Sequence, residues 1–142
     1  MNIIDTNLSF NNNYSLQNEN LINTIILHHS GVSVEQSVEV IHNYHKNTRG
    51  YAGIGYHFYV RKNGEIYKGR NINWVGAHAY KYNTNSIGIC FEGDFDNEQM
   101  TDAQIKSGKE LIKYLCEKYH ISKNRILGHR DVCATSCPRK KL

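Results

Sequence analysis

The sequence predicts a single α/β domain in which helices flank a central mixed β-sheet. Three observations lead to this prediction. Strand-like and helix-like segments follow one another as strand, helix, hairpin, strand, helix, strand. The length of 142 residues suits one domain with its own hydrophobic core. No linker rich in glycine and serine divides the chain, which contains a single proline.

The first half of the chain predicts a strand followed by a helix. Residues Thr24–His29 form an apolar, β-branched run typical of a buried strand. Residues 33–36 have the pattern of a capping box, and apolar spacing predicts a helix from there to about Asn47. His42 and His45 fall on this helix. Since no third ligand is near, packing or surface roles are favoured over a metal site.

A hairpin follows a glycine-rich loop at residues 50–55. Composition predicts strands at 56–60 and 65–68. Asn63-Gly64 between them predicts a two-residue turn. The hairpin adds two antiparallel strands to the sheet.

The remaining elements are two strands separated by a helix. An apolar run predicts a strand at 86–91, and residues 101–104 form a second capping box that opens a helix. The apolar face of this helix contains Ile105, Gly108, Leu111, Ile112, Leu115 and Tyr119. Residues 125–128 predict a short last strand that delivers His129 to a loop.

Composition and charge argue against two classes of protein. Apolar residues make up 39% and charged residues 21%, which is ordinary for a globular domain. The net charge of +4 is mild, and no recognition-helix or aromatic-platform pattern accompanies it, so we expect no nucleic-acid partner. No apolar stretch approaches the roughly 20 residues of a membrane span, so we expect no membrane insertion. We expect a monomer.

The four cysteines fall into two groups. Cys90 and Cys116 lie in apolar strand-like and helix-like patterns, which indicates small buried side chains. Cys133 and Cys137 lie in a polar loop. A short local disulfide and a thiolate metal ligand are both open interpretations there.

Three residues form a candidate metal site. His28 ends a buried strand, His129 follows another, and Cys137 lies eight residues after His129. Two imidazoles and a thiolate suit Zn²⁺, and three protein ligands leave a fourth position for water.

Spacing alone leaves the choice of ligands open. Neighbouring strand residues point to opposite faces, so only one of His28 and His29 can face a metal. Spacing does not choose between them, and it does not rank this set above His57 or His78. A zinc site and its absence are equally supported at this point.

Five short motifs occur in the order found in a known family. They are Ile26–Gly31, Ile54–Phe58, Val75–His78, Tyr82–Ile89 and Gly128–Pro138. Together they span most of the chain, and they resemble the zinc-dependent N-acetylmuramoyl-L-alanine amidases. That family includes amidase-type phage lysozymes and animal peptidoglycan recognition proteins.

The resemblance implies roles for residues at a metal centre. His28, His129 and Cys137 are expected to hold zinc, which leaves His29 a structural role. Tyr56 is expected to be catalytic.

Further residues are assigned by the same matching. Thr135 is expected to donate a hydrogen bond to the developing oxyanion. His78 and Asn83 are expected to line the substrate groove. In the recognition proteins, the pair matched by Asn73-Trp74 helps to separate lysine-type from diaminopimelate-type stems. Here the pair resembles a mixture, so Trp74 is a substrate-binding candidate without a stated preference.

The implied activity is hydrolysis of the amide bond between N-acetylmuramic acid and L-alanine in bacterial peptidoglycan. A non-catalytic peptidoglycan-binding module is the alternative. Non-catalytic members usually lose a metal ligand, most often the cysteine, and Cys137 is present here. A structural zinc closed by Cys133 is a further alternative. A zinc peptidase is disfavoured because the chain has no His-Glu-x-x-His motif.

The resemblance also sets expectations for domains and location. Residues 1–142 are expected to be the amidase catalytic domain, with residues 1–21 as an N-terminal extension. Many relatives continue into a further helix or a wall-binding domain, which we expect to be absent from this chain. Arg139 stands where such families often have glycine. The start of the chain lacks a secretory pattern, so we expect cytoplasmic synthesis and release by lysis or another route. A phage-type lysin is favoured over an autolysin or a recycling enzyme.

Overall fold

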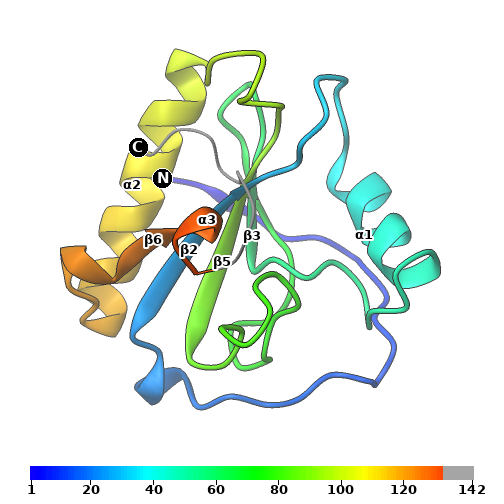
Figure 1. The fold of residues 1–142 in the computed structure, drawn as a ribbon, viewed down its shortest axis with the longest axis vertical. Coiled ribbons are helices and arrows are strands. Elements are labelled where there is room, and N and C mark those ends of the chain that lie inside the picture. The colour runs from blue at the N-terminus through cyan, green and yellow to red at the C-terminus, as the bar shows by residue number, and fades with distance from the viewer. Residues whose placement is uncertain (133–142) are drawn as a thin grey trace.

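The computed structural model describes residues 1–132 and places them around one mixed β-sheet (Figure 1). The strands are β1 (Ile3–Ile4), β2 (Thr24–His29), β3 (Phe58–Val60), β4 (Ile66–Lys68), β5 (Ser86–Phe91) and β6 (Ile126–Gly128). The helices are α1 (Val38–Asn47), α2 (Asp102–Tyr119) and α3 (His129–Val132), with 3₁₀ turns η1 (Glu19–Leu21) and η2 (Lys123–Arg125). The predicted fold class is confirmed.

The sheet has the strand order β1-β4-β3-β5-β2-β6. Only the β3–β4 hairpin is antiparallel among the described pairs, and the other neighbouring strands run parallel. β2 therefore lies between β5 and β6. Parallel strands end at the same edge of a sheet, so the residues that follow β2 and β6 come close together.

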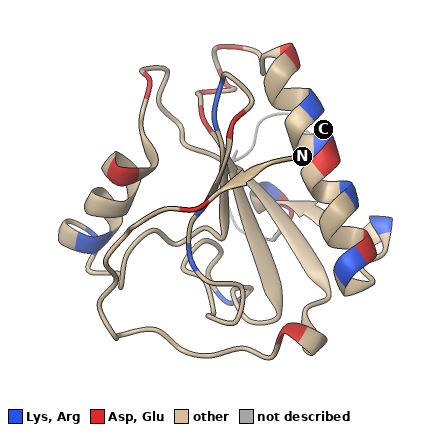
Figure 2. Ribbon diagram, turned by 180° about the vertical axis from the view of Figure 1, so that it is seen from behind, with Lys and Arg blue, Asp and Glu red and all other residues tan. Residues whose placement is uncertain are grey.

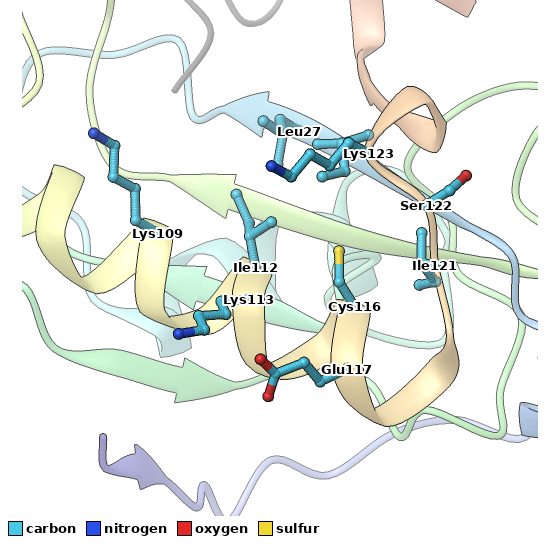
Figure 3. A pocket seen from close by; sticks show the side chains of 10 residues that line it. Leu27, Lys109, Ile112, Lys113, Cys116, Glu117, Ile121, Ser122 and Lys123 are labelled. Atoms are coloured by element: carbon cyan, nitrogen blue, oxygen red, sulfur yellow. The ribbon is translucent and has the colours of Figure 1, made fainter.

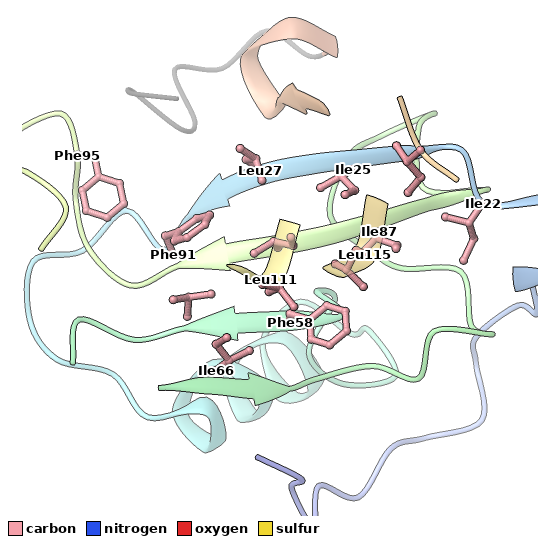
Figure 4. Packing of buried hydrophobic residues seen from close by; sticks show 13 residues of the cluster. Ile22, Ile25, Leu27, Phe58, Ile66, Ile87, Phe91, Phe95, Leu111 and Leu115 are labelled. Carbon is pink, nitrogen blue, oxygen red and sulfur yellow. The ribbon is translucent and has the colours of Figure 1, made fainter. Parts of the chain in front are cut away.

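The two faces of the sheet carry different layers. Side chains that alternate along β2 and β5 point to α2, where they form the larger core (Figure 4). Its members on these three elements are Ile25, Leu27, Ile87, Ile89, Phe91, Leu111 and Leu115. The opposite face meets α1 through a smaller cluster that includes Val38, Ile41, Ile54, Tyr59 and Cys90. α1 and α2 thus cover opposite faces of the sheet (Figure 1).

The N-terminus of α1 differs from the prediction. The helix begins at Val38, and the Ser37 hydroxyl caps it by accepting from the Val40 N–H at 3.3 Å. The Gln36 N–H donates instead to the Glu92 carboxylate at 2.7 Å. The proposed capping box at residues 33–36 is therefore wrong, because the Gln36 N–H is bonded to Glu92, the residue just after β5. The predicted end at Asn47 is confirmed.

The hairpin turn is also longer than predicted. The Arg61 N–H donates to the Glu65 carbonyl, and the Gly64 N–H donates to the Arg61 carbonyl, both at 2.9 Å. Gly64 has φ +90°. This is a three-residue loop ending on a left-handed glycine, so the two-residue turn is wrong.

Helix α2 follows its predicted pattern. The Thr101 hydroxyl accepts from the Gln104 N–H at 3.0 Å, and the Gln104 side chain accepts from the Thr101 N–H at 3.4 Å. This reciprocal pair is the predicted capping box. The helix buries Leu111 and Leu115 against the sheet.

Residues 1–21, predicted as an extension, pack against the rest of the domain. β1 adds a parallel edge strand beside β4. Gln17 is buried, and its side-chain amide donates to the carbonyls of Ile72 and Ser86. This segment therefore adds an edge strand to the sheet and bonds to the backbone at Ile72 and at the start of β5.

Charged residues lie mainly around the outside of the fold. Figure 2 shows basic and acidic residues mixed along α2, while β2 and β5 are neutral along most of their length. Within residues 1–132, no helix combines the length and apolar content that crossing a bilayer requires.

Candidate active site

Two histidines meet at one edge of the sheet. β2 and β6 pair in register, with Leu27 opposite Gly128, so the next residue of each strand lies at the same level. Leu27 faces α2, and the strand alternation turns His28 to the opposite face. The Nδ1 atoms of His28 and His129 lie 3.1 Å apart.

A tight turn holds His129 in place. The Gly128 N–H donates to the Asp131 carboxylate at 2.6 Å. His129 is the first residue of α3 rather than part of a loop, which corrects the prediction. Its side chain is half-buried beside His28.

The two imidazoles fit a zinc ion in their chemistry and spacing. Zinc–nitrogen bonds of about 2.0–2.1 Å in tetrahedral geometry place two ligand nitrogens about 3.3 Å apart. Within residues 1–132, no group of three His, Cys, Asp or Glu side chains is arranged to hold a metal ion. The third expected ligand, Cys137, lies outside the described residues, as do Thr135 and Cys133. The described chain thus supplies two candidate ligands.

His78 joins this pair from the loop before β5. Its Nδ1 lies 2.9 Å from His28 Nε2, and its Nε2 lies 3.3 Å from the Ser86 hydroxyl. His29, by contrast, accepts from the Phe95 N–H at 3.1 Å. His28 therefore faces the cluster, and His29 faces away from it.

Burial favours the neutral form of these imidazoles. It lowers the pKa of His28 well below its usual range, and His78 and His129 lower it further by charge repulsion. Burial likewise lowers the pKa of His78 and, by a smaller amount, that of His129. Neutral imidazole is the form that binds metal ions.

A cavity of about 500 Å³ opens beside the histidines. Its lining consists of His45, Arg49, Tyr51, Tyr56, Ala77, His78, Ala79, Tyr80, Asn83 and His129. The volume falls within the range of small-ligand sites. The Tyr56 ring centroid lies 5.1 Å from that of His28, so the predicted catalytic tyrosine lies next to the candidate metal ligands.

The end of α1 and the residues just after it line this cavity, although the sequence did not single them out as binding groups. His45 lies in the last turn of α1, and Arg49 follows the C-cap residue Thr48. Tyr51 follows in the glycine-rich loop. Nothing in the local sequence indicates that these residues meet the cavity.

His42 and His45 also tie α1 to the glycine-rich loop. The Ile54 N–H donates to His42 Nδ1 at 3.0 Å, and the Gly55 N–H donates to His45 Nδ1 at 2.9 Å. A Cβ at Gly53 would lie 2.3 Å from the His42 ring, so the loop needs glycine to come this close. The packing role favoured for His42 and His45 is what the structure shows.

The other predicted groove residues have different surroundings. Asn83 lines the cavity, and its side-chain oxygen accepts from the N–H groups of His78 and Ala79, both at 2.8 Å. Trp74 stacks on Tyr14 at a centroid distance of 3.9 Å and meets the edge of Phe10. Trp74 is not among the described residues that line the cavity. Its role in substrate binding stays a prediction.

A larger cavity of about 670 Å³ lies on the other side of the sheet, against α2 (Figure 3). Its lining residues are Leu27, Lys109, Ile112, Lys113, Cys116, Glu117, Ile121, Ser122, Lys123 and Ile126. None of these is a histidine, and the side chain of Leu27 points away from His28. We therefore place the active site in the smaller cavity, where the titratable groups converge.

The chain is similar to known proteins over the segments that form this site. A family model described as N-acetylmuramoyl-L-alanine amidase matches residues 17–140. Peptidoglycan-recognition protein SC2 of Drosophila melanogaster is 35% identical over 127 residues, covering 84% of this chain and 69% of that protein. The endolysin N-acetylmuramoyl-L-alanine amidase LysCS from Clostridium intestinale has 40% identity and a TM-score of 0.87, covering 96% of this chain and 86% of that one. A Drosophila PGRP-LB mutant in complex with tracheal cytotoxin has 29% identity and a TM-score of 0.82, covering 96% and 87%.

Proposed function

Because the chain belongs to the N-acetylmuramoyl-L-alanine amidase family, we propose that it cuts the bond between N-acetylmuramic acid and L-alanine in bacterial peptidoglycan, with zinc as cofactor. The observation that carries this proposal is the placement of two imidazoles, those of His28 and His129, side by side. Their Nδ1 atoms lie 3.1 Å apart beside a cavity of about 500 Å³.

His28, His129 and Cys137 would hold the zinc ion. A zinc ion there would supply a Lewis acid that polarises the scissile carbonyl and makes water a better nucleophile. The Tyr56 hydroxyl, on a ring next to His28, would orient the attacking water by hydrogen bonding. Thr135 would donate a hydrogen bond to the oxygen on which negative charge develops.

The cavity lining suits an anionic, partly apolar ligand. Arg49 contributes a positive charge, and none of the lining residues in the described chain is an aspartate or a glutamate. Tyr80 is 78% exposed at the cavity and offers a ring for stacking. A stem peptide carries carboxylates and a glycan carries apolar sugar faces, so both kinds of group have a counterpart here.

A non-catalytic binding module is the main competing function, since recognition proteins are among the relatives. The two functions differ in what happens to purified peptidoglycan. We expect wild type to release peptides with a free N-terminal alanine, which mass spectrometry detects. His129→Ala should sediment with peptidoglycan but release none. Binding by wild type without any new N-terminal alanine would favour the binding module.

A structural zinc is the second alternative, with Cys133 as a fourth ligand. Metal analysis of Cys133→Ala and Cys137→Ala separates the two arrangements. We expect Cys137→Ala to lose zinc and Cys133→Ala to keep it together with activity. Loss of zinc in Cys133→Ala would indicate a closed structural site.

We further propose that the protein acts on the bacterial cell wall after release by lysis or another route, as a phage-type lysin would. Its activity on intact cells, added from outside, is the relevant assay. A gene for a membrane-pore protein next to this one would support the lytic role. An autolysin or recycling role would be favoured by a genomic setting without phage genes.

A further inference from the structure

We infer that a buried hydrogen-bond chain, His28–His78–Ser86, fixes His28 in the tautomer whose Nδ1 lone pair faces His129. In this view His78 is a positioning residue, in addition to forming part of the cavity wall. The inference rests on the proposed function, because the lone pair would serve the zinc ion.

The direction of the hydrogen bonds between His28, His78 and Ser86 follows from the contacts of Ser86. The Ser86 hydroxyl lies 2.8 Å from the Tyr82 carbonyl and 3.0 Å from the Asn83 carbonyl. A hydroxyl has one hydrogen, and a carbonyl can only accept it. The Ser86 oxygen must therefore accept at its contact with His78, so the His78 Nε2 carries the hydrogen.

The hydrogen on His78 Nε2 determines the direction of the hydrogen bond between His78 and His28. A neutral imidazole with hydrogen on Nε2 has a lone pair on Nδ1. His78 Nδ1 lies 2.9 Å from His28 Nε2, so His28 Nε2 donates. The hydrogen of His28 is then on Nε2, and its Nδ1 lone pair points to His129, 3.1 Å away.

The His78 ring has little freedom to break this chain. A Cβ added at Gly88 would lie 2.6 Å from the ring, and one added at Gly76 would lie 2.5 Å from it. Because Gly76 and Gly88 have no side chains, they leave a narrow space against the backbone in which only a flat ring fits. Asn83 fixes the backbone, since its side chain accepts from the His78 N–H at 2.8 Å.

The consequence is a ligand that is oriented before a metal arrives. A histidine that binds a metal through one nitrogen commonly donates from the other, and losing the outer partner typically costs about 10–100-fold in metal affinity. Here the outer partner is another histidine, itself anchored by a serine and a backbone carbonyl. We expect His78 and Ser86 to tune zinc affinity without contacting zinc.

The first test reads the tautomer in zinc-free protein by ¹⁵N NMR of the imidazoles. We expect His28 to show a protonated Nε2 and an unprotonated Nδ1. In His78→Leu the same resonances should move toward the average of two exchanging tautomers. Protonation of His28 on Nδ1 in zinc-free wild type would overturn the inference, and this readout does not depend on activity.

The second test measures zinc affinity by competition with a chromophoric chelator. His78→Leu removes the acceptor, whereas His78→Asn keeps a carbonyl oxygen near the position of Nδ1. We expect about 10–100-fold weaker binding for His78→Leu, with partial recovery in His78→Asn. Ser86→Ala removes only the anchor, and we expect a smaller loss of a few fold.

Thr24→Val is the matched control. Thr24 lies opposite Ser86 in the β2–β5 register, and it also carries a buried hydroxyl. Its hydrogen bonds go to Asn23 and Arg125, away from His28. We expect its zinc affinity to equal that of wild type.

The outcomes separate two kinds of failure. Wild type that binds no zinc would contradict the proposed function, while the NMR test would still decide the tautomer. Wild type that binds zinc no better than His78→Leu and Ser86→Ala would overturn the positioning role. If His78→Leu does not fold, the comparison of Ser86→Ala with Thr24→Val decides.

Discussion

His57 is fully buried, and backbone groups hold both of its ring nitrogens. Its Nδ1 accepts from the Gly88 N–H at 3.0 Å, and its Nε2 donates to the Trp74 carbonyl at 2.8 Å. Burial lowers its pKa to about 4, the Trp74 hydrogen bond opposes this, and the charge of Arg70 adds to it. The neutral ring is therefore held by the fold, with both of its nitrogens engaged by backbone groups.

This pKa predicts a pH-dependent stability. The folded pKa lies below the unfolded value of about 6.5, so the unfolded chain binds the proton first as pH falls. The contribution of His57 is present above pH 6.5 and is lost between about 6.5 and 4, by about 3 kcal/mol in total. Urea unfolding across this window should show a shallower pH slope for His57→Gln than for wild type. Equal slopes would contradict the prediction.

Arg49 tests the electrostatic part of substrate binding. Its side chain lines the cavity from the segment just after α1. We expect Arg49→Gln to raise KM for soluble muramyl peptides about two- to tenfold with little change in kcat, because an exposed charge acts mainly on binding. The effect should shrink in high salt.

Lys46→Gln is the control for Arg49. Lys46 lies in the last turn of α1, three residues before Arg49, carries the same charge and donates to the Ser9 carbonyl outside the cavity. We expect its KM to stay near that of wild type. An equal rise in both variants would show that net charge, rather than the position of Arg49, is responsible.

The sequence predicted residues of the candidate metal site but not the contacts that surround them. Motif matching placed His28 and Tyr56 at the site, and the structure brings them together with His129. The link from His28 to His78 joins residues 50 positions apart and has no local pattern. The role of Trp74 in the groove stays a prediction. Its contacts with Tyr14 and Phe10 could not be predicted, because the N-terminal segment has no pattern of its own.

At the scale of elements, locally encoded features were predicted well. β2 and β5 have the predicted bounds because an apolar, β-branched run is legible on its own. The capping box of α2 is local too. The start of α1 and the length of the hairpin turn differ from the prediction because both segments bond to Glu92. Its carboxylate accepts hydrogen bonds from the backbone N–H groups of Gln36 and Lys62. The partners of a buried carboxylate of this kind are distant in the sequence, so a local residue pattern does not predict them.

The cap of α2 should matter more than that of α1. The Thr101 hydroxyl accepts from the Gln104 N–H and also donates to the Lys62 carbonyl, so it joins the helix to the hairpin. Ser37 caps α1 through one bond at 3.3 Å. We expect Thr101→Ala to lower the free energy of unfolding by about 2 kcal/mol and Ser37→Ala by about 0.5–1 kcal/mol. Denaturant midpoints check this, and equal losses would mean that the hairpin contact adds nothing.

At the scale of the molecule, the N-terminal segment completes the α1 face. Phe10 packs against His42 and Trp74, and β1 extends the sheet beyond β4. The sequence suggested an extension because these residues are polar and rich in asparagine. Their few apolar side chains pack only once the sheet has formed, which a linear pattern does not reveal.

Trp74 is the only tryptophan, so its fluorescence reports on this packing. We expect Phe10→Ala to shift its emission to the red and to lower the free energy of unfolding by about 1–2 kcal/mol, since the Phe10 ring is only partly buried. Leu16→Ala is the control, because the Leu16 side chain is 74% exposed nearby. Equal shifts in the two variants would contradict this packing.

One measurement tests most directly whether the chain is a zinc-dependent amidase. Protein stripped of metal by a chelator is titrated with zinc while N-terminal alanine released from purified peptidoglycan is counted. We predict no release without zinc and full release at one zinc per chain, with the stem peptides otherwise intact. Release that is independent of zinc, cleavage within the stem peptide, or no release at any zinc level would contradict the claim.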